Sequence, residues 1–254
     1  VPVDDDVVID WHGATTHAAW AGASVDARLP VQAAIARTVP IDVAFVLDTT
    51  GSMSDEIDRI RATLGQVVAK LGGGDRPIDL RIGAVLYRDH GDEYLTRVEP
   101  LTADVGAFRR KLDDVSAGGG GDEPEALNVG LSQAVHQLQW RQDAARVAFL
   151  IADAGPHMEI DGEVPYLTSS RDAAGAGLRV HTVAASGLPQ SGTLVFRQVA
   201  AVTRGQFVFI EYGGSVAATA ASHGVANPEQ VSANNLDQIL YDRVKAEVDG
   251  WGVR

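Results

Sequence analysis

Three oxygen-bearing side chains, Asp48, Thr50 and Ser52, follow one another at alternate positions directly after an apolar run. Because alternate residues of an extended loop can point the same way, these three side chains can converge on one point. One carboxylate and two hydroxyls are hard oxygen donors, which suit Mg²⁺ or Mn²⁺ better than a soft metal. The spacing therefore predicts a divalent-cation site at this turn.

A strand and a helix must position this turn. Residues 41–47 are apolar on both alternating faces, which is typical of a central strand covered by helices on both sides. After the turn, apolar residues recur at steps of three and four, at Ile57, Ile60, Leu64, Val67 and Leu71. Asp55 and Glu56 fall in the first turn of this amphipathic helix, where the helix dipole favours acids.

The rest of the chain alternates between the same two kinds of element. Buried-strand patterns occur at 80–88, 146–153, 178–184 and 206–210, and helical patterns at 104–115, 127–138, 166–176, 193–203 and 236–248. Residues 96–101 predict a short antiparallel edge strand. This alternation predicts an α/β fold, with a doubly wound, mostly parallel central sheet and helices on both faces. Ligands of such sheets bind outside the carboxyl ends of the strands, where Asp48, Asp89 and Asp153 would lie.

Length and composition bound the possibilities further. The 254 residues allow one large domain with a small appendage. We expect an N-terminal extended or β segment at 1–38 that flanks a main domain at 39–254. The alternative is that the N-terminal residues form a small separate module. The net charge of −13 argues against non-specific binding to nucleic acid or to an anionic membrane. The absence of cysteine excludes disulfides and thiolate metal sites. No apolar run has the length of a membrane-spanning helix, and the first ten residues do not resemble a signal region.

Other patterns with chemical potential are weaker. The glycines at 118–121 lack the following Lys-Ser/Thr of a nucleotide-binding P-loop, and Gly-x-Ser-x-Gly is absent. His157 has no second histidine at metal-ligand spacing, which argues against catalytic zinc. The polar loop with Asp89, His90 and Asp92 can either select a partner or be a solvated loop.

Taken together, three motifs resemble the von Willebrand factor type A domain: DTTGSM at 48–53, GGGDEPEAL at 119–127 and LIADAGPH at 150–157. The resemblance covers about residues 41–212. It implies a doubly wound fold with a metal-ion-dependent adhesion site on the upper rim. Asp48, Thr50 and Ser52 match the D-x-[S/T]-x-S motif of that site, and Asp153 matches the aspartate that reaches the ion through water. In this family a carboxylate from a partner protein fills an open position on the ion.

The second motif departs from the family pattern. Well-known members have a threonine ligand after the glycines, and the corresponding residue here is Asp122. An aspartate could coordinate the ion or hold a water, and its charge would weaken the pull of the ion on a partner carboxylate. The alternative is that Asp122 and Glu125 form a capping box at the start of a helix.

We therefore expect a non-catalytic protein-binding or adhesion domain that depends on Mg²⁺ (or Mn²⁺ or Ca²⁺) and binds a partner presenting an acidic residue. The resemblance to adhesion domains favours an extracytoplasmic role. One alternative is a Mg²⁺-dependent phosphatase or phosphotransferase with Asp48 as nucleophile, but such enzymes need a second aspartate where Thr50 stands. The other is a structural domain with a vestigial metal site.

Overall fold

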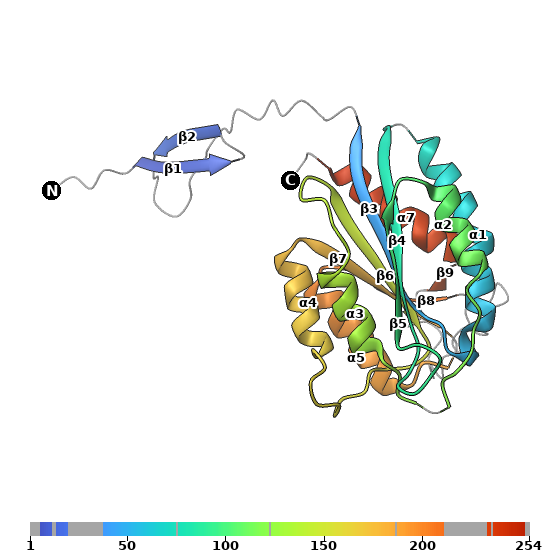
Figure 1. The fold of residues 1–254 in the computed structure, drawn as a ribbon. Coiled ribbons are helices and arrows are strands. Elements are labelled where there is room, and N and C mark those ends of the chain that lie inside the picture. The colour runs from blue at the N-terminus through green and yellow to red at the C-terminus, as the bar shows by residue number, and fades with distance from the viewer. Residues whose placement is uncertain are drawn as a thin grey trace. The chain divides into compact units, whose positions relative to one another are not determined.

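The computed structural model describes residues 6–11, 14–19, 38–74, 76–121, 123–185, 187–210, 233–234 and 236–251. The chain divides into two compact units, Val1–Ala36 and Arg37–Arg254. In the first unit, β1 (Asp6–Trp11) and β2 (Ala14–Ala19) pair as an antiparallel two-stranded sheet (Figure 1). How this unit relates to the main domain, as flanking segment or separate module, stays a prediction.

The second unit is built on a seven-stranded sheet in the order β5-β4-β3-β6-β7-β8-β9. Its strands are β3 (Val39–Asp48), β4 (Ile78–Tyr87), β5 (Thr96–Thr102), β6 (Ala145–Ala152), β7 (Leu178–Ala184), β8 (Phe207–Ile210) and β9 (Ala233–Asn234). All neighbours pair in parallel except β5, which lies antiparallel to β4 at the edge. The predicted fold class is confirmed, including the short antiparallel edge strand.

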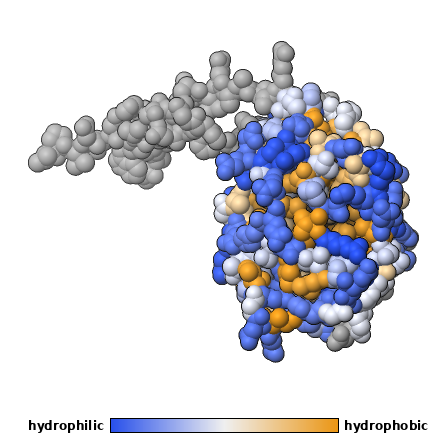
Figure 2. Space-filling model, in the orientation of Figure 1, coloured by the Kyte–Doolittle hydropathy of each residue, from blue (hydrophilic) through white to orange (hydrophobic). Residues whose placement is uncertain are grey.

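Helices cover both faces of this sheet (Figure 1). One face carries α1 (Ser54–Gly72), α2 (Val105–Asp113) and α7 (Leu236–Gly250), and the other carries α3 (Leu127–His136), α4 (Tyr166–Gly175) and α5 (Gln190–Val202). The face of the molecule in Figure 2 is mostly hydrophilic, with smaller apolar areas between the polar ones. Within the described ranges, no helix combines the length and the apolar character needed to span a membrane.

Strand β3 is the centre of the packing, as its apolar pattern predicted. Val43, Phe45 and Leu47 belong to the core under α1, α2 and α7, whereas the alternating residues Ala44 and Val46 belong to the core under α3, α4 and α5. All five are buried. The strand is therefore held from both faces, which fixes the position at which its carboxyl end delivers Asp48.

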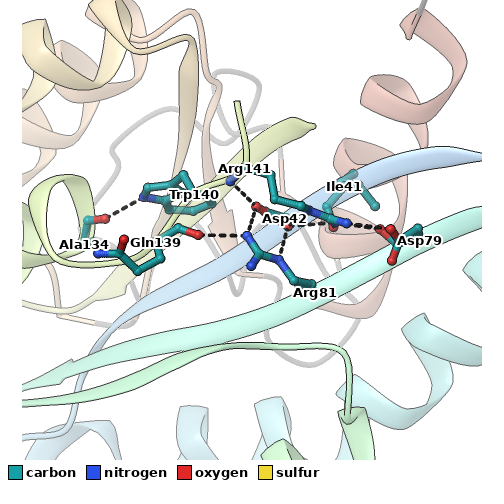
Figure 3. Close-up of polar contacts among 8 residues, drawn as sticks. All are labelled: Ile41, Asp42, Asp79, Arg81, Ala134, Gln139, Trp140 and Arg141. Atoms are coloured by element: carbon teal, nitrogen blue, oxygen red, sulfur yellow. Dashed lines mark hydrogen bonds and ion pairs between the residues drawn. The ribbon is translucent and has the colours of Figure 1, made fainter. Parts of the chain in front are cut away.

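The amino end of β3 carries a buried ion-pair network (Figure 3). Asp42 is fully buried and accepts hydrogen bonds from Arg81 Nε (2.9 Å) and Nη2 (2.6 Å), and from Arg141 Nε (2.9 Å) and its backbone N–H (2.8 Å). Burial by itself would raise the pKa of Asp42, but the hydrogen bonds from the two arginines outweigh it and hold the pKa below its usual value. The network joins β3, β4 and the segment before β6 at the end of the sheet opposite Asp48.

A buried histidine on β7 gives this fold a predictable response to acid. His181 is 3% exposed, its ring stacks on Phe149 with the centroids 5.5 Å apart, and its Nδ1 accepts a hydrogen bond from the backbone N–H of Gln206 (3.1 Å). Burial, with help from Arg243 and Arg179, lowers the pKa of His181 from 6.5 to about 3. The imidazole is therefore neutral in the folded protein at neutral pH.

Between pH 6.5 and pH 3, His181 is protonated in the unfolded chain but neutral in the folded protein. We therefore expect the free energy of unfolding to fall as the pH drops from 6.5 towards 3. The slope for this group is about 1.4 kcal/mol per pH unit. Urea unfolding of the parent and of His181→Gln at pH 7 and pH 5 measures it, since glutamine does not titrate. Between pH 7 and pH 5, the free energy of unfolding of the parent should fall by roughly 2 kcal/mol more than that of His181→Gln. A constant difference would show that His181 is not the acid-sensitive group.

Candidate metal site

The candidate site lies at the carboxyl end of the sheet, where the strand order changes direction. From β3 the chain first adds β4 and β5 on one side and then crosses to add β6 and β7 on the other. Asp48 is the last residue of β3, Asp89 lies two residues after β4, and Asp153 directly follows β6. This is the position at which doubly wound sheets bind ligands.

The three oxygen side chains of the first loop are close together. Asp48 Oδ1 accepts hydrogen bonds from the Thr50 hydroxyl (2.6 Å) and from the Thr50 backbone N–H (2.9 Å), and Thr50 Oγ1 lies 3.5 Å from Ser52 Oγ. Neighbouring ligands of an octahedral Mg²⁺ at 2.0–2.1 Å are about 2.9 Å apart, which falls between these two oxygen–oxygen distances. The spacing of the loop oxygens therefore suits such an ion.

Asp48 has a free oxygen in a strongly unfavourable setting. Its side chain is fully buried, and Oδ2 has no hydrogen-bond partner among the residues that the structure describes. Burial and the charges of Asp153 and Asp89 together raise the pKa of Asp48 to about 7, although the hydrogen bonds from Thr50 oppose the shift. A buried carboxylate with no cationic partner is costly, and a bound divalent cation would remove that cost.

The second aspartate, Asp153, joins the same cluster. It is 8% exposed. Burial raises the pKa of Asp153, as does the nearby charge of Glu56, whereas the neighbouring hydroxyl of Ser52 lowers it. The structure thus brings Asp48, Thr50, Ser52 and Asp153 together from two separate loops.

Asp122 lies outside the described residues, so its role as a ligand stays a prediction. The capping-box alternative, however, is wrong. Helix α3 begins at Leu127, and its N-cap residue is Ala126, with no side-chain capping bond. Glu125 therefore precedes the cap, whereas a capping box needs the glutamate three residues after it.

Glu125 instead faces the candidate site, which the sequence analysis did not predict. Its side chain is 4% exposed, and Oε2 has no hydrogen-bond partner. Burial raises the pKa of Glu125 to about 8, together with the charges of Asp48, Asp89, Asp92 and Asp153. The only signal for Glu125 in the sequence was its carboxylate within the second motif, and its spacing of three residues from Asp122 favoured the interpretation as part of a capping box.

The glycine loop at 118–121 brings these groups together by close backbone approach. The Gly118 N–H donates to the carbonyl of Thr49, and the Gly51 N–H donates to the carbonyl of Gly119, both at 3.1 Å. Gly120 has a φ of +66°, and a Cβ built on it would lie 2.6 Å from Glu125 Oε1 and 2.7 Å from Thr50 Cβ. A side chain at this position would therefore separate Glu125 from the first loop.

In the described part of the site, three buried oxygens lack a hydrogen-bond partner: Asp48 Oδ2, Glu125 Oε2 and the hydroxyl of Tyr87. Tyr87 stands beside Asp48 in the register of β3 and β4. Within the part of the chain that the structure describes, no group of three or more His, Asp or Glu side chains is arranged to hold a metal by itself. A cation here would depend on the hydroxyls of Thr50 and Ser52 as well as on carboxylates, and the unpartnered oxygens fit that kind of site.

Comparison with known proteins gives the family. The model of the von Willebrand factor A domain matches residues 42–211, which include most of β3 and the loops of the site. The chain belongs to the von Willebrand factor A domain family. Membership of this family indicates a protein-interaction function.

Individual relatives support the same assignment. The chain is 29% identical over 119 residues to the alpha-protein kinase vwkA of Dictyostelium discoideum, covering 46% of this chain and 19% of the kinase. It is 31% identical over 133 residues to human von Willebrand factor A domain-containing protein 7, covering 51% of this chain and 14% of that protein. The matched part thus spans less than a fifth of the length of either relative.

Solved structures show the same fold. BatB of Bacteroides thetaiotaomicron, a conserved hypothetical protein, aligns over 82% of this chain and 99% of its own with a TM-score of 0.53 and 15% identity. Proximal thread matrix protein 1 from the mussel byssus aligns over 84% of this chain and 47% of its own with a TM-score of 0.56 and 15% identity. At this level of identity the likeness extends to the fold of the von Willebrand factor A domain and no further.

Proposed function

We propose that this von Willebrand factor A domain binds a divalent cation, with Mg²⁺ as the first candidate and Mn²⁺ or Ca²⁺ as alternatives, and uses it to bind a partner protein. Asp48, Thr50 and Ser52 hold the ion, Asp153 acts from the outer shell, and an Asp or Glu of the partner completes the coordination. The observation that carries this proposal is the buried, unpartnered Oδ2 of Asp48 beside two hydroxyls and a second aspartate.

The charge balance supports a cation at this position. Helix α1 begins at Ser54, directly beside the site, and the positive end of its dipole repels cations. The carboxylates of Asp48 and Asp153 outweigh that partial charge, and Glu125, whose pKa is raised to about 8 in the metal-free protein, adds negative charge once a bound cation favours its ionised form. The same excess of acid weakens the attraction between the ion and a partner carboxylate, so we expect partner affinity to depend on contacts beyond the ion.

Binding rather than catalysis fits the residues around Asp48. Thr50 stands where a Mg²⁺-dependent phosphatase would need a second aspartate, and its hydroxyl donates to Asp48 Oδ1 at 2.6 Å. A nucleophilic role for Asp48 would need that oxygen, or the buried Oδ2, to reach a substrate. The domain therefore functions by presenting a metal ion.

Calorimetric titration of Mg²⁺ and of Mn²⁺ into EDTA-treated protein tests the site. We expect one binding site in the parent and none in Asp48→Ala, because the alanine variant loses the carboxylate that the ion neutralises. Asp172→Ala is the matched control, since Asp172 is an exposed acid on α4 that contacts His136. Parent protein that binds neither ion, or an Asp48→Ala variant that binds like the parent, would refute the proposed site.

The partner chemistry needs a second experiment. Binding of the protein to an array of peptides, each with one central Asp or Glu, is compared in Mg²⁺ and in EDTA. We expect a subset of peptides to bind only in Mg²⁺ and to lose binding when the acid is replaced by Asn or Gln. Binding that is unchanged by EDTA would contradict a metal-mediated contact.

A further inference from the structure

Two loops at the rim are joined by a reciprocal pair of imidazole–carboxylate contacts. The loop after β4 supplies Asp89 and His90, and the loop after β6 supplies His157 and Glu163. His157 Nε2 donates to Asp89 Oδ1 at 2.7 Å, and His90 Nε2 lies 2.6 Å from Glu163 Oε1. The two imidazole rings meet edge to face, with centroids 5.7 Å apart. We refer to these four residues as the rim clamp.

The contact between His157 and Asp89 is the more buried half of the rim clamp. The side chains of His157 and Asp89 are 22% and 11% exposed, whereas that of His90 is 40% exposed. The sequence left two interpretations of the loop after β4, partner selection or a solvated loop. The burial of Asp89 shows that this loop is not simply solvated. A hydrogen bond to a carboxylate that is shielded from water is stronger than one on the open surface.

The rim clamp is connected to the groups of the candidate metal site. The backbone N–H of His157 donates to the carbonyl of Glu125 (3.2 Å), and the N–H of Glu125 donates to the carbonyl of Gly155 (3.0 Å). Gly155 lies two residues after Asp153 on the same loop. A shift of His157 would therefore move two segments, the one that carries Glu125 and the one that carries Asp153.

The start of α3 is tied into the same arrangement. Asn128 Nδ2 donates to the carbonyl of His157 (2.7 Å) and to Glu163 Oε2 (3.3 Å). On the other side, the N–H of Ala126 donates to the carbonyl of Arg88 (3.2 Å), next to Asp89. Because the like charges on Asp89 and Asp153 repel each other, the loops that carry them need such cross-links to stay close without a cation.

We infer that His157 is a positioning residue for the cation site: its hydrogen bond to Asp89 holds the loop with Asp153 and the segment with Glu125 in the geometry that binds the ion. This inference rests on the proposed function and adds a residue that does not touch the ion. Outer-shell hydrogen bonds of this kind contribute to metal affinity because the ligands need not be reorganised on binding.

The test compares Mg²⁺ affinity, measured by calorimetry, in three replacements of His157. We expect His157→Ala to bind Mg²⁺ roughly 10- to 100-fold more weakly than the parent. His157→Gln should recover most of the affinity, because its amide N–H₂ group lies about as far along the side chain as Nε2. His157→Asn, whose amide nitrogen reaches only the level of Nδ1, should bind as weakly as His157→Ala.

His136→Ala is the control, since His136 makes an imidazole–carboxylate contact with Asp172 (3.4 Å) at the far end of α3. We expect it to bind Mg²⁺ like the parent. The inference is overturned if His157→Ala binds like the parent, if Gln and Asn behave alike, or if His136→Ala is equally weakened. Failure of the parent itself to bind any of Mg²⁺, Mn²⁺ and Ca²⁺ would instead refute the proposed function, and this inference with it.

Discussion

Asp48→Asn should make the metal-free protein more stable at pH 8 and abolish its stabilisation by Mg²⁺. The variant keeps an oxygen to accept the hydrogen bonds from Thr50 but removes a buried charge that has no cationic partner. The folded-state pKa of Asp48 is raised to about 7, above the ordinary value of 3.8, so ionisation costs the folded protein stability as the pH rises through this range. The expected gain in the free energy of unfolding is on the order of a few kcal/mol, at about 1.4 kcal/mol per pKa unit.

Urea unfolding in EDTA at pH 8 and at pH 4 measures this gain. We expect the variant to exceed the parent in stability at pH 8 and to approach it at pH 4, where the carboxyl group of the parent is protonated in the folded protein and partly protonated in the unfolded chain. In Mg²⁺ at 100 times its dissociation constant, the parent should gain about 2.7 kcal/mol and the variant nothing. A variant that is less stable than the parent in EDTA at pH 8 would mean that Asp48 has a stabilising partner in the metal-free protein.

Asp42→Asn, the same change on the same strand, should have the opposite effect. Both aspartates are fully buried, but Asp42 accepts four hydrogen bonds from Arg81 and Arg141 (Figure 3). Removing its charge leaves the partly buried guanidinium of Arg81 without its carboxylate partner and leaves Arg141 with only Asp79. Breaking a buried ion pair in this way costs 3–5 kcal/mol, and we expect about 3 kcal/mol because both arginines keep some contact with water.

The same urea experiment at pH 8 measures this loss, and Mg²⁺ provides the internal control. Because Asp42 lies at the opposite end of β3 from the site, Asp42→Asn should bind Mg²⁺ with the affinity of the parent wherever it is folded. A variant with parental stability would show that water replaces the ion pair at no cost. A variant that is folded but has lost Mg²⁺ binding would show that the two ends of β3 are coupled.

The sequence by itself determined most of the fold, because the signals are local. Alternation at Val43, Phe45 and Leu47 predicted a strand buried on both faces, and steps of three and four residues predicted α1. Residues 104–115 were predicted to be helical, and Asp104 caps α2, since its side chain accepts a hydrogen bond from the Ala107 N–H at 2.8 Å. Strand β9 was not predicted, since two residues carry no periodicity and their pairing with β8 defines them.

The sequence also determined which side chains can form the first loop of the site, since Asp48, Thr50 and Ser52 are neighbours in the chain and their spacing alone brings their oxygens together. What only the tertiary structure decided is the state of each charge. Asp42 and Asp48 are the same residue type on one strand, yet arginines from distant segments surround the first and carboxylates surround the second. Glu125 and His157 join the site for the same reason. Pairing and desolvation depend on contacts between residues far apart in the chain, and local patterns in the sequence do not record them.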